Sequence, residues 1–302
     1  MKALAEQVLK FDLRSISKAL SAVENRKEGY LDLLDDLYKR GKPSKVIGVT
    51  GAPGVGKSTL VDLYVNELVN NKKKVAVIAV DPTSPFSGGA ILGDGIRMQS
   101  NYDNVFIRSV ATRGAIGGVS DAVFNMIVVF RAAGYEYVII ETVGVGQNEI
   151  SISKLSDLAL LVMNPGSGDD IQMMKAGIME IGDVFVINKS DHPGADELEA
   201  FMRSSFTDKE AKVVKTSAKT GQGVKELVAL VDSIYMSEKE KINIKHKSIL
   251  KEGLKYLLIQ ETSRKVDEIL EHASLSLDDI IGASKSPYSE MKRLLKGGFL
   301  KW

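Results

Sequence analysis

Residues 51–58 constrain this chain more than any other feature. They read Gly-Ala-Pro-Gly-Val-Gly-Lys-Ser and fit the phosphate-loop pattern, in which four residues separate a glycine from Gly-Lys-Ser. The apolar run 46–49 directly precedes the motif, and a helix-like stretch, 57–69, begins inside it. A phosphate loop needs a strand before it and a helix after it. The chain is therefore predicted to build an α/β core around a nucleotide site.

The residue types in this loop have a chemical reason. Glycines at 51, 54 and 56 allow the backbone to curl, so that its N–H groups surround phosphate oxygens at a helix N-terminus. Lys57 is predicted to neutralise phosphate charge, and Ser58 to ligate magnesium. The predicted nucleotide-binding residues of this loop are Gly51, Ala52, Pro53, Gly54, Val55, Gly56, Lys57, Ser58 and Thr59.

Short β-branched runs alternate with helix-like stretches from residue 45 onward. Several runs are apolar on both faces, as in 138–140, and helical segments separate most of them. This pattern favours a mainly parallel sheet covered on both faces, which is a doubly wound α/β fold of the P-loop NTPase type. The seven predicted strands are 45–50, 74–80, 105–110, 137–142, 158–163, 184–188 and 212–216.

Both ends of the chain are predicted to be helical. Residues 1–43 are charged and carry apolar residues at helical spacing, which indicates one or two helices. After residue 235 the strand pattern disappears, and Lys and Glu mix with Leu and Ile. With 302 residues, one large core and smaller appendages are expected. The predicted division is an N-terminal extension (1–43), a nucleotide-binding domain (44–235) and a C-terminal region (236–302).

Composition argues against several classes of partner. Lys and Arg total 40 against 39 Asp and Glu, so the net charge of +1 indicates neither nucleic acid nor an anionic membrane as a partner. The absence of cysteine excludes disulfides and thiolate metal sites. The start of the chain lacks a signal-peptide pattern, and no apolar run approaches the ~20 residues of a membrane span. A cytoplasmic location is expected.

Two further motifs indicate which base the nucleotide carries. Residues 188–191, Asn-Lys-Ser-Asp, follow the apolar run 184–187 and resemble the Asn-Lys-x-Asp motif of GTPases. The Asp191 carboxylate could accept the two N–H donors on the edge of guanine, a pair that adenine lacks. Alone, the tetrapeptide could be a turn signal, but residues 216–219, Thr-Ser-Ala-Lys, resemble the second guanine loop. The two motifs therefore predict that the site binds GTP in preference to ATP. The predicted base-site residues are Asn188, Lys189, Asp191, Ser217, Ala218 and Lys219.

Carboxylates near the predicted phosphate site are candidate magnesium ligands. Glu141 ends the strand 137–140, and residues 141–144 stand where GTPases usually show Asp-x-x-Gly. Glu141 could ligate the ion or orient the attacking water, while Gly144 could offer its N–H to the γ-phosphate. Asp81 and Asp94 are the other candidate magnesium ligands, although loop aspartates are often only solvated. Lys57, Asp81 and Glu141 are the predicted catalytic residues.

Four further segments resemble the MeaB/ArgK family of GTPases. They are Val80-Asp-Pro-Thr-Ser-Pro, Ser87-Gly-Gly-Ala-Ile-Leu-Gly-Asp94, Glu141-Thr-Val-Gly-Val-Gly-Gln147 and Lys175-Ala-Gly-Ile-Met-Glu180. The resemblance covers about residues 45–235. It implies a GTPase chaperone for an adenosylcobalamin-dependent acyl-CoA mutase, typically methylmalonyl-CoA mutase, whose cofactor loading it gates and which it protects. It also implies a homodimer formed largely through C-terminal helices.

One further segment of the chain resembles the family, and one pair of residues differs from the family's usual sequence. Residues 165–175 resemble an additional switch region of the family, although a solvated turn leading into a helix would look similar. Gly95 and Ile96 stand where the family usually has Lys-Thr, so a change in intrinsic hydrolysis is expected. Gln147 could position the attacking water or cap a loop.

Three other functions fit parts of the pattern. An ATPase or kinase serving lysine, arginine and ornithine transport matches older naming in the family, but the guanine motifs argue against it. A metallochaperone GTPase would need histidine or cysteine clusters, whereas His192, His246 and His272 are isolated along the chain. A static nucleotide-binding protein would show no magnesium-dependent GTP turnover.

Overall fold

The computed structural model describes residues 1–81, 104–111, 118–142, 153–166, 182–206, 212–272 and 286–296. The chain divides into two compact units, Met1–Gly253 and Leu254–Trp302, and each is described by itself. The domain limits predicted above remain predictions.

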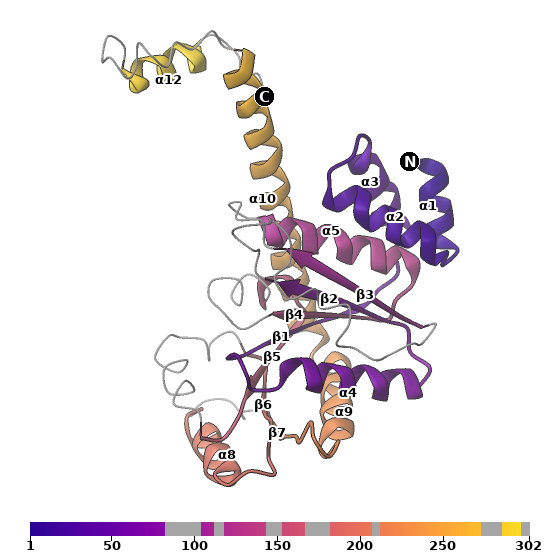
Figure 1. The fold of residues 1–302 in the computed structure, drawn as a ribbon, viewed down its shortest axis with the longest axis vertical. Helices are drawn as coiled ribbons and strands as arrows, with labels where there is room; N and C mark the ends of the chain where they lie inside the picture. The colour runs from indigo at the N-terminus through magenta and orange to yellow at the C-terminus, as the bar shows by residue number, and fades with distance from the viewer. Residues whose placement is uncertain are drawn as a thin grey trace. The chain divides into compact units, whose positions relative to one another are not determined.

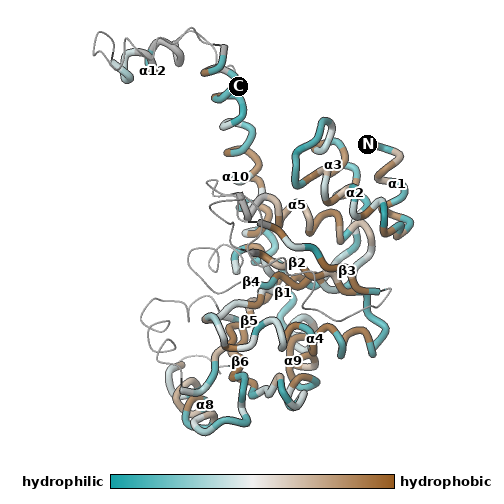
Figure 2. The backbone as a smooth tube through the Cα atoms, in the orientation of Figure 1, coloured by the Kyte–Doolittle hydropathy of each residue, from teal (hydrophilic) through white to brown (hydrophobic). Residues whose placement is uncertain are grey.

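Seven parallel strands form one sheet in the order β3-β2-β4-β1-β5-β6-β7 (Figure 1). This confirms the predicted α/β fold, and each predicted strand is present with ends shifted by at most a residue or so. In Figure 2 the strands are among the most hydrophobic parts of the backbone, as expected of a sheet covered on both faces. The strands are β1 (Lys45–Thr50), β2 (Val75–Asp81), β3 (Val105–Ala111), β4 (Tyr137–Thr142), β5 (Leu158–Met163), β6 (Val184–Ile187) and β7 (Val213–Lys215).

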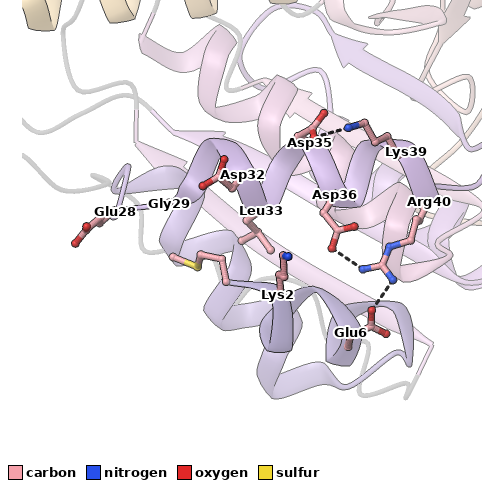
Figure 3. A pocket seen from close by; sticks show the side chains of 11 residues that line it. Lys2, Glu6, Glu28, Gly29, Asp32, Leu33, Asp35, Asp36, Lys39 and Arg40 are labelled. Carbon is pink, nitrogen blue, oxygen red and sulfur yellow. Dashed lines mark hydrogen bonds and ion pairs between the residues drawn. The ribbon is translucent and has the colours of Figure 1, made fainter.

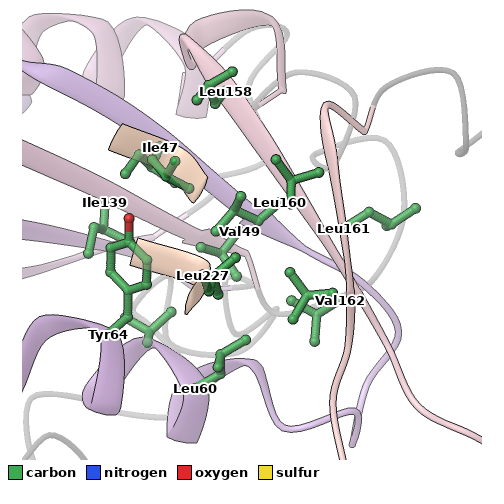
Figure 4. Close-up of a cluster of buried hydrophobic side chains, with 14 of the residues drawn as sticks. Ile47, Val49, Leu60, Tyr64, Ile139, Leu158, Leu160, Leu161, Val162 and Leu227 are labelled. Carbon is green, nitrogen blue, oxygen red and sulfur yellow. The ribbon is translucent and has the colours of Figure 1, made fainter. Parts of the chain in front are cut away.

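Helices cover both faces of the sheet. α4 (Lys57–Asn70) and α9 (Val224–Ser237) pack together on one face, and α5 (Gly118–Ala133) lies on the other (Figure 1). α8 (Ala195–Ser204) packs against β6 and β7. Leu60 and Tyr64 of α4 and Leu227 of α9 meet strand residues in the core (Figure 4). The sheet is thus held rigidly from both sides, which fixes the strand ends that carry the site.

The N-terminal extension contains three helices, so the expectation of one or two was wrong. They are α1 (Lys2–Leu9), α2 (Leu13–Glu24) and α3 (Tyr30–Arg40), and all three pack on α5. The turn between α1 and α2 contains neither glycine nor proline. Phe11 adopts a positive φ of 63°, and the Asp12 carboxylate caps α2 by accepting the Ser15 N–H at 2.8 Å. Sequence periodicity alone could not reveal that break.

α10 (Lys239–His272) is one continuous helix of 34 residues. In the first unit its residues Ile242 and Ile249 are buried. A Cβ on Gly253 would lie 2.4 Å from the Phe124 ring, so any larger residue would force this ring of α5 to shift.

The second unit contains the rest of α10 and α12 (Pro287–Lys296). Its described part is helical, as predicted. Large apolar side chains of α10 are exposed here, among them Leu254, Leu258 and Leu270. Among the described residues, no helix combines the length and apolar character needed to cross a membrane.

Candidate functional site

The phosphate loop joins the end of β1 to the start of α4. Gly51, Gly54 and Gly56 all have positive φ, of 146°, 76° and 94°. A Cβ on Gly51 would lie 2.1 Å from the Val162 carbonyl oxygen, and one on Gly56 would lie 2.5 Å from the Asn188 side chain. A Cβ on Gly54 would meet nothing within 4 Å. Two of the glycines therefore permit close packing beneath the loop, and the third lies at its open side.

Lys57 lies at the first position of α4, inside the curve of the loop. Its side chain is buried, and Nζ donates hydrogen bonds to the carbonyl oxygens of Gly51 at 2.8 Å and Ala52 at 2.9 Å. The ammonium is thus held where the loop N–H groups and the start of the helix favour negative charge. Phosphate oxygens could replace the carbonyl oxygens as its partners. Ala52 and Val55 anchor the loop in the core, while Pro53 and Thr59 are exposed.

Ser58 and Glu141 bring two oxygen atoms together beside the loop. Ser58 Oγ donates to Glu141 Oε1 at 2.5 Å. Glu141 is buried in β4, opposite Val49 of β1, and therefore comes from the strand next to the one that carries the loop. A glutamate at this position is long enough to reach the hydroxyl at the start of the helix.

This oxygen pair fits what magnesium requires in nucleotide sites. Magnesium is usually held by one or two protein oxygens, with phosphate oxygens and waters completing its shell. Within the described ranges, no three histidine, aspartate or glutamate residues gather into a metal-binding group. Asp81 ends β2, but its side chain is not described, and Asp94 and Gly144 lie outside the described residues. Ser58 and Glu141 are thus the described candidates for holding the ion.

Asn188 joins the phosphate loop to both predicted guanine loops. Its side chain is fully buried. Nδ2 donates to the Val55 carbonyl oxygen at 2.8 Å, and Oδ1 accepts from Thr216 Oγ1 at 3.2 Å and from the Ala218 N–H at 3.1 Å. One side chain therefore fixes the separation between the phosphate loop and the loops after β6 and β7. The sequence motif assigns no role to Thr216. In the structure its hydroxyl donates to Asn188 Oδ1 and orients that side chain.

The Asp191 carboxylate lies at the end of this network. Ser217 Oγ donates to Asp191 Oδ1 at 2.7 Å. This hydrogen bond, supported by a backbone N–H, lowers the pKa of Asp191 below its ordinary value, so the carboxylate is charged at neutral pH. Lys189 adopts a positive φ of 55° and donates to the Gly54 carbonyl oxygen at 2.7 Å. The structure thus brings Lys189, Asp191 and Ser217 to the same edge of the sheet as the phosphate loop, and Lys219 is exposed on the Ser217 loop.

The remaining predicted features lie outside the described residues. They are the segment 82–103 with Gly95 and Ile96, residues 143–152 with Gln147, and most of the segment 165–175.

A separate surface pocket of about 790 Å³ lies among α1 and α3 (Figure 3). Its lining is rich in acids, but these are largely paired within the pocket. Arg40 contacts Glu6 at 2.6 Å and Asp36 at 2.5 Å, and Lys39 contacts Asp35 at 2.6 Å. None of the predicted nucleotide residues lines it. The carboxyl edge of the sheet is therefore the stronger candidate site.

A parallel sheet with a phosphate loop after β1 and guanine loops after β6 and β7 defines the class of P-loop GTPases. Comparison with known families places the chain within that class. Residues 16–268 match the family model described as "Methylmalonyl Co-A mutase-associated GTPase MeaB". The chain belongs to the MeaB family of GTPases, as the resemblance predicted.

Individual relatives agree with this assignment. A protein of Pyrococcus horikoshii whose name provisionally calls it a GTPase is 38% identical over 97% of this chain and 96% of its own length. GTPase ArgK of Escherichia coli is 41% identical over 59% of this chain and 55% of its own. The methylmalonic aciduria type A homolog of Caenorhabditis elegans is 44% identical over 53% and 42%.

One solved structure resembles the whole chain. The crystal structure of a LAO/AO transport system kinase has a TM-score of 0.68 and covers 98% of this chain and 96% of its own. At 23% sequence identity, this likeness supports the fold alone.

Proposed function

We propose that the chain binds GTP at the carboxyl edge of its sheet, hydrolyses it to GDP and phosphate, and uses the nucleotide state to control a partner protein. The observation that carries the proposal is the Asn188 side chain, which bonds the phosphate loop to the loop after β7, where Ser217 in turn holds Asp191 of the loop after β6. A nucleotide spanning the two parts would have its phosphates at Lys57 and its base at Asp191. The charged Asp191 carboxylate matches the two N–H donors of guanine and leaves adenine without a partner.

The proposed reaction is in-line attack of water on the γ-phosphate. Lys57 would exchange the carbonyl oxygens of Gly51 and Ala52 for phosphate oxygens and stabilise the charge that develops there. Backbone N–H groups of the loop and the start of α4 would hold the remaining oxygens. Ser58 and Glu141, with Asp81 or Asp94 as further proposed ligands, would hold magnesium, which supplies additional neutralisation of phosphate charge when bound. Slow turnover without a partner is expected.

The proposed partner is an adenosylcobalamin-dependent acyl-CoA mutase, most simply methylmalonyl-CoA mutase. Support comes from the family description, which names association with that enzyme, and from the matching segments in this chain. The chain would act as a chaperone that gates cofactor loading and protects the mutase. A homodimer is proposed as well, because the second unit exposes Leu254, Leu258 and Leu270 along one helix.

Magnesium-dependent hydrolysis of GTP and ATP, measured with and without such a mutase from the same organism, tests the proposal. GTP-selective turnover that the mutase accelerates would support both the GTPase activity and the mutase as partner. GTP-selective turnover that is indifferent to the mutase would keep the GTPase and remove this client. Turnover of ATP and GTP at equal rates would contradict the base-site assignment.

A further inference from the structure

The amino ends of β5 and β6 carry the same arrangement twice. Asp157 directly precedes β5, and Asp183 directly precedes β6. Each carboxylate accepts a backbone N–H from the neighbouring strand. Asp157 Oδ2 accepts from Val46 of β1 at 2.8 Å, and Asp183 Oδ2 accepts from Ala159 of β5 at 2.9 Å. Both carboxylates are thus built into the edge of the sheet opposite the phosphate loop.

α10 supplies basic side chains to both of these carboxylates, and for Asp183 these include Lys241, whose Nζ lies 3.4 Å from Oδ1. Lys245 Nζ donates to Asp183 Oδ2 at 2.6 Å, and His246 Nε2 lies 2.7 Å from Asp157 Oδ1. The two atoms of the second contact do not have hydrogen-bond geometry, so their attraction is that of an ion pair when the imidazole carries a proton. His246, expected to be isolated, therefore faces the carboxylate of Asp157.

Burial makes these contacts hard to break. The Asp157 side chain is fully buried, and its Oδ2 also accepts from the Tyr235 hydroxyl at 2.9 Å. For Asp183, burial acts to raise the pKa, but Lys245, together with the Ala159 N–H and Lys241, outweighs it and leaves the pKa lowered. A buried carboxylate that loses its polar partners is costly, so displacement of either carboxylate should carry α10 with it.

Both carboxylates lie at the starts of strands whose other ends reach the phosphate loop. β5 begins at Leu158, directly after Asp157, and the carbonyl oxygen of its Val162 packs under Gly51. β6 begins at Val184, directly after Asp183, and ends at Ile187. The next residue, Asn188, donates to the Val55 carbonyl oxygen of the phosphate loop at 2.8 Å. Each strand thus joins the predicted phosphate site to the edge of the sheet that α10 contacts.

We propose that residues 239–253 of α10 respond to the nucleotide state, and that Asp157 and Asp183 transmit it through their contacts with His246 and Lys245. This inference rests on the proposed function, since it needs a nucleotide at the phosphate loop. By linkage, fixing α10 should in turn change nucleotide affinity.

Hydrogen exchange measured by mass spectrometry tests this on the full chain, saturated either with GDP or with a non-hydrolysable GTP analogue. We expect peptides from 239–253 to exchange at different rates in the two states. In the double variant K245Q/H246Q this difference should fall by about threefold or more, because the two short contacts that carry it are lost and only the longer Lys241–Asp183 contact remains. Fluorescent GDP and GTP-analogue titrations should show that both nucleotides still bind.

Glu136→Gln is the matched control. Glu136 directly precedes β4 at the same edge of the sheet, but its partner is Lys73, at 2.9 Å, and not a residue of α10. This variant should keep the exchange difference of the wild type. Asp157→Asn, if it folds by circular dichroism, should lower the exchange difference by less than the double variant does, because it leaves the contact of Lys245 with Asp183 intact.

The outcomes separate the inference from the proposed function. If the nucleotides bind but peptides 239–253 exchange equally in both states, the inference is overturned and the GTPase stands. If K245Q/H246Q keeps the full difference, transmission through the two carboxylates is overturned. Failure of GTP to bind would remove the proposed function and this inference with it.

Discussion

The two edges of the same parallel sheet use polar groups in opposite ways. At the carboxyl edge, the Lys57 ammonium is held by carbonyl oxygens of its own loop, and Ser58 bonds to Glu141, so a nucleotide and its metal can replace these contacts. At the amino edge, Asp157 and Asp183 accept backbone N–H groups and pair with α10. The comparison teaches that the proposed nucleotide site lies where polar contacts can be exchanged, while the contacts of the opposite edge tie α10 to the ends of β5 and β6.

The largest expected effect is the loss of GTP turnover when Lys57, at the carboxyl edge, is replaced. Lys57→Ala should lower GTP turnover by about a hundredfold to a thousandfold, because the developing phosphate charge loses its counterion. Phosphate release under saturating GTP measures this. Lys39→Ala removes an exposed lysine from the N-terminal extension and should turn over normally. Near-normal hydrolysis by Lys57→Ala would refute the proposed active site.

Substitutions at the amino edge of the sheet should lower the stability of the protein. Asp157→Asn should lower the free energy of unfolding by about 3 kcal/mol, since the Val46 N–H and the Tyr235 hydroxyl lose a buried carboxylate as their acceptor. Urea titration followed by circular dichroism gives this value. The control Glu136→Gln breaks a half-exposed pair with Lys73 and should cost less than about 1 kcal/mol. Equal losses in the two variants would remove the distinction between buried and exposed pairs.

Substitutions of two glycines in the phosphate loop, at the carboxyl edge, should differ in their effect on stability. Gly51→Ala places a methyl group 2.1 Å from a backbone oxygen, whereas Gly54→Ala has open space and suffers only from its positive φ. In the absence of nucleotide, Gly51→Ala should therefore be less stable than Gly54→Ala by about 2 kcal/mol. Equal urea midpoints for the two variants would contradict the packing described beneath the loop.

The smallest effect is expected from the hydroxyl that supports Asp191. The Ser217 hydrogen bond lowers the pKa of Asp191, so the wild-type carboxylate stays charged to lower pH. Ser217→Ala should let that pKa rise, and GTP affinity should then begin to fall at a higher pH as the solution is acidified from pH 7. Fluorescent GTP titrations across pH compare the two proteins. Superimposable pH profiles would contradict this role for Ser217.

Much of the fold could be predicted because local patterns and long-range packing agree. The runs 138–140 and 158–163 are apolar on both faces and proved to lie in interior strands of the sheet, β4 and β5. The break between α1 and α2 could not be predicted, because it depends on the Phe11 backbone and the Asp12 cap rather than on glycine or proline. Strand order also depends on packing that no local pattern encodes.

The proposed nucleotide residues lie in short contiguous motifs, and the structure brings the loops after β1, β6 and β7 together at one edge of the sheet. Asp157, Asp183 and their partners on α10 could not be predicted, because they meet only after the sheet and the helix have packed. An aspartate directly before two successive strands was a signal that could have been noticed. A histidine almost ninety residues later in the chain offered no hint of its partner.

The most direct test of the account is the ratio of kcat/KM for GTP to that for ATP, measured in the wild type and in Asp191→Asn. The joined phosphate and guanine loops predict a strong GTP preference in the wild type. They also predict a fall of about tenfold to a hundredfold in that preference when the charged acceptor is removed. Equal use of the two nucleotides by the wild type, or an unchanged ratio in Asp191→Asn, would contradict it.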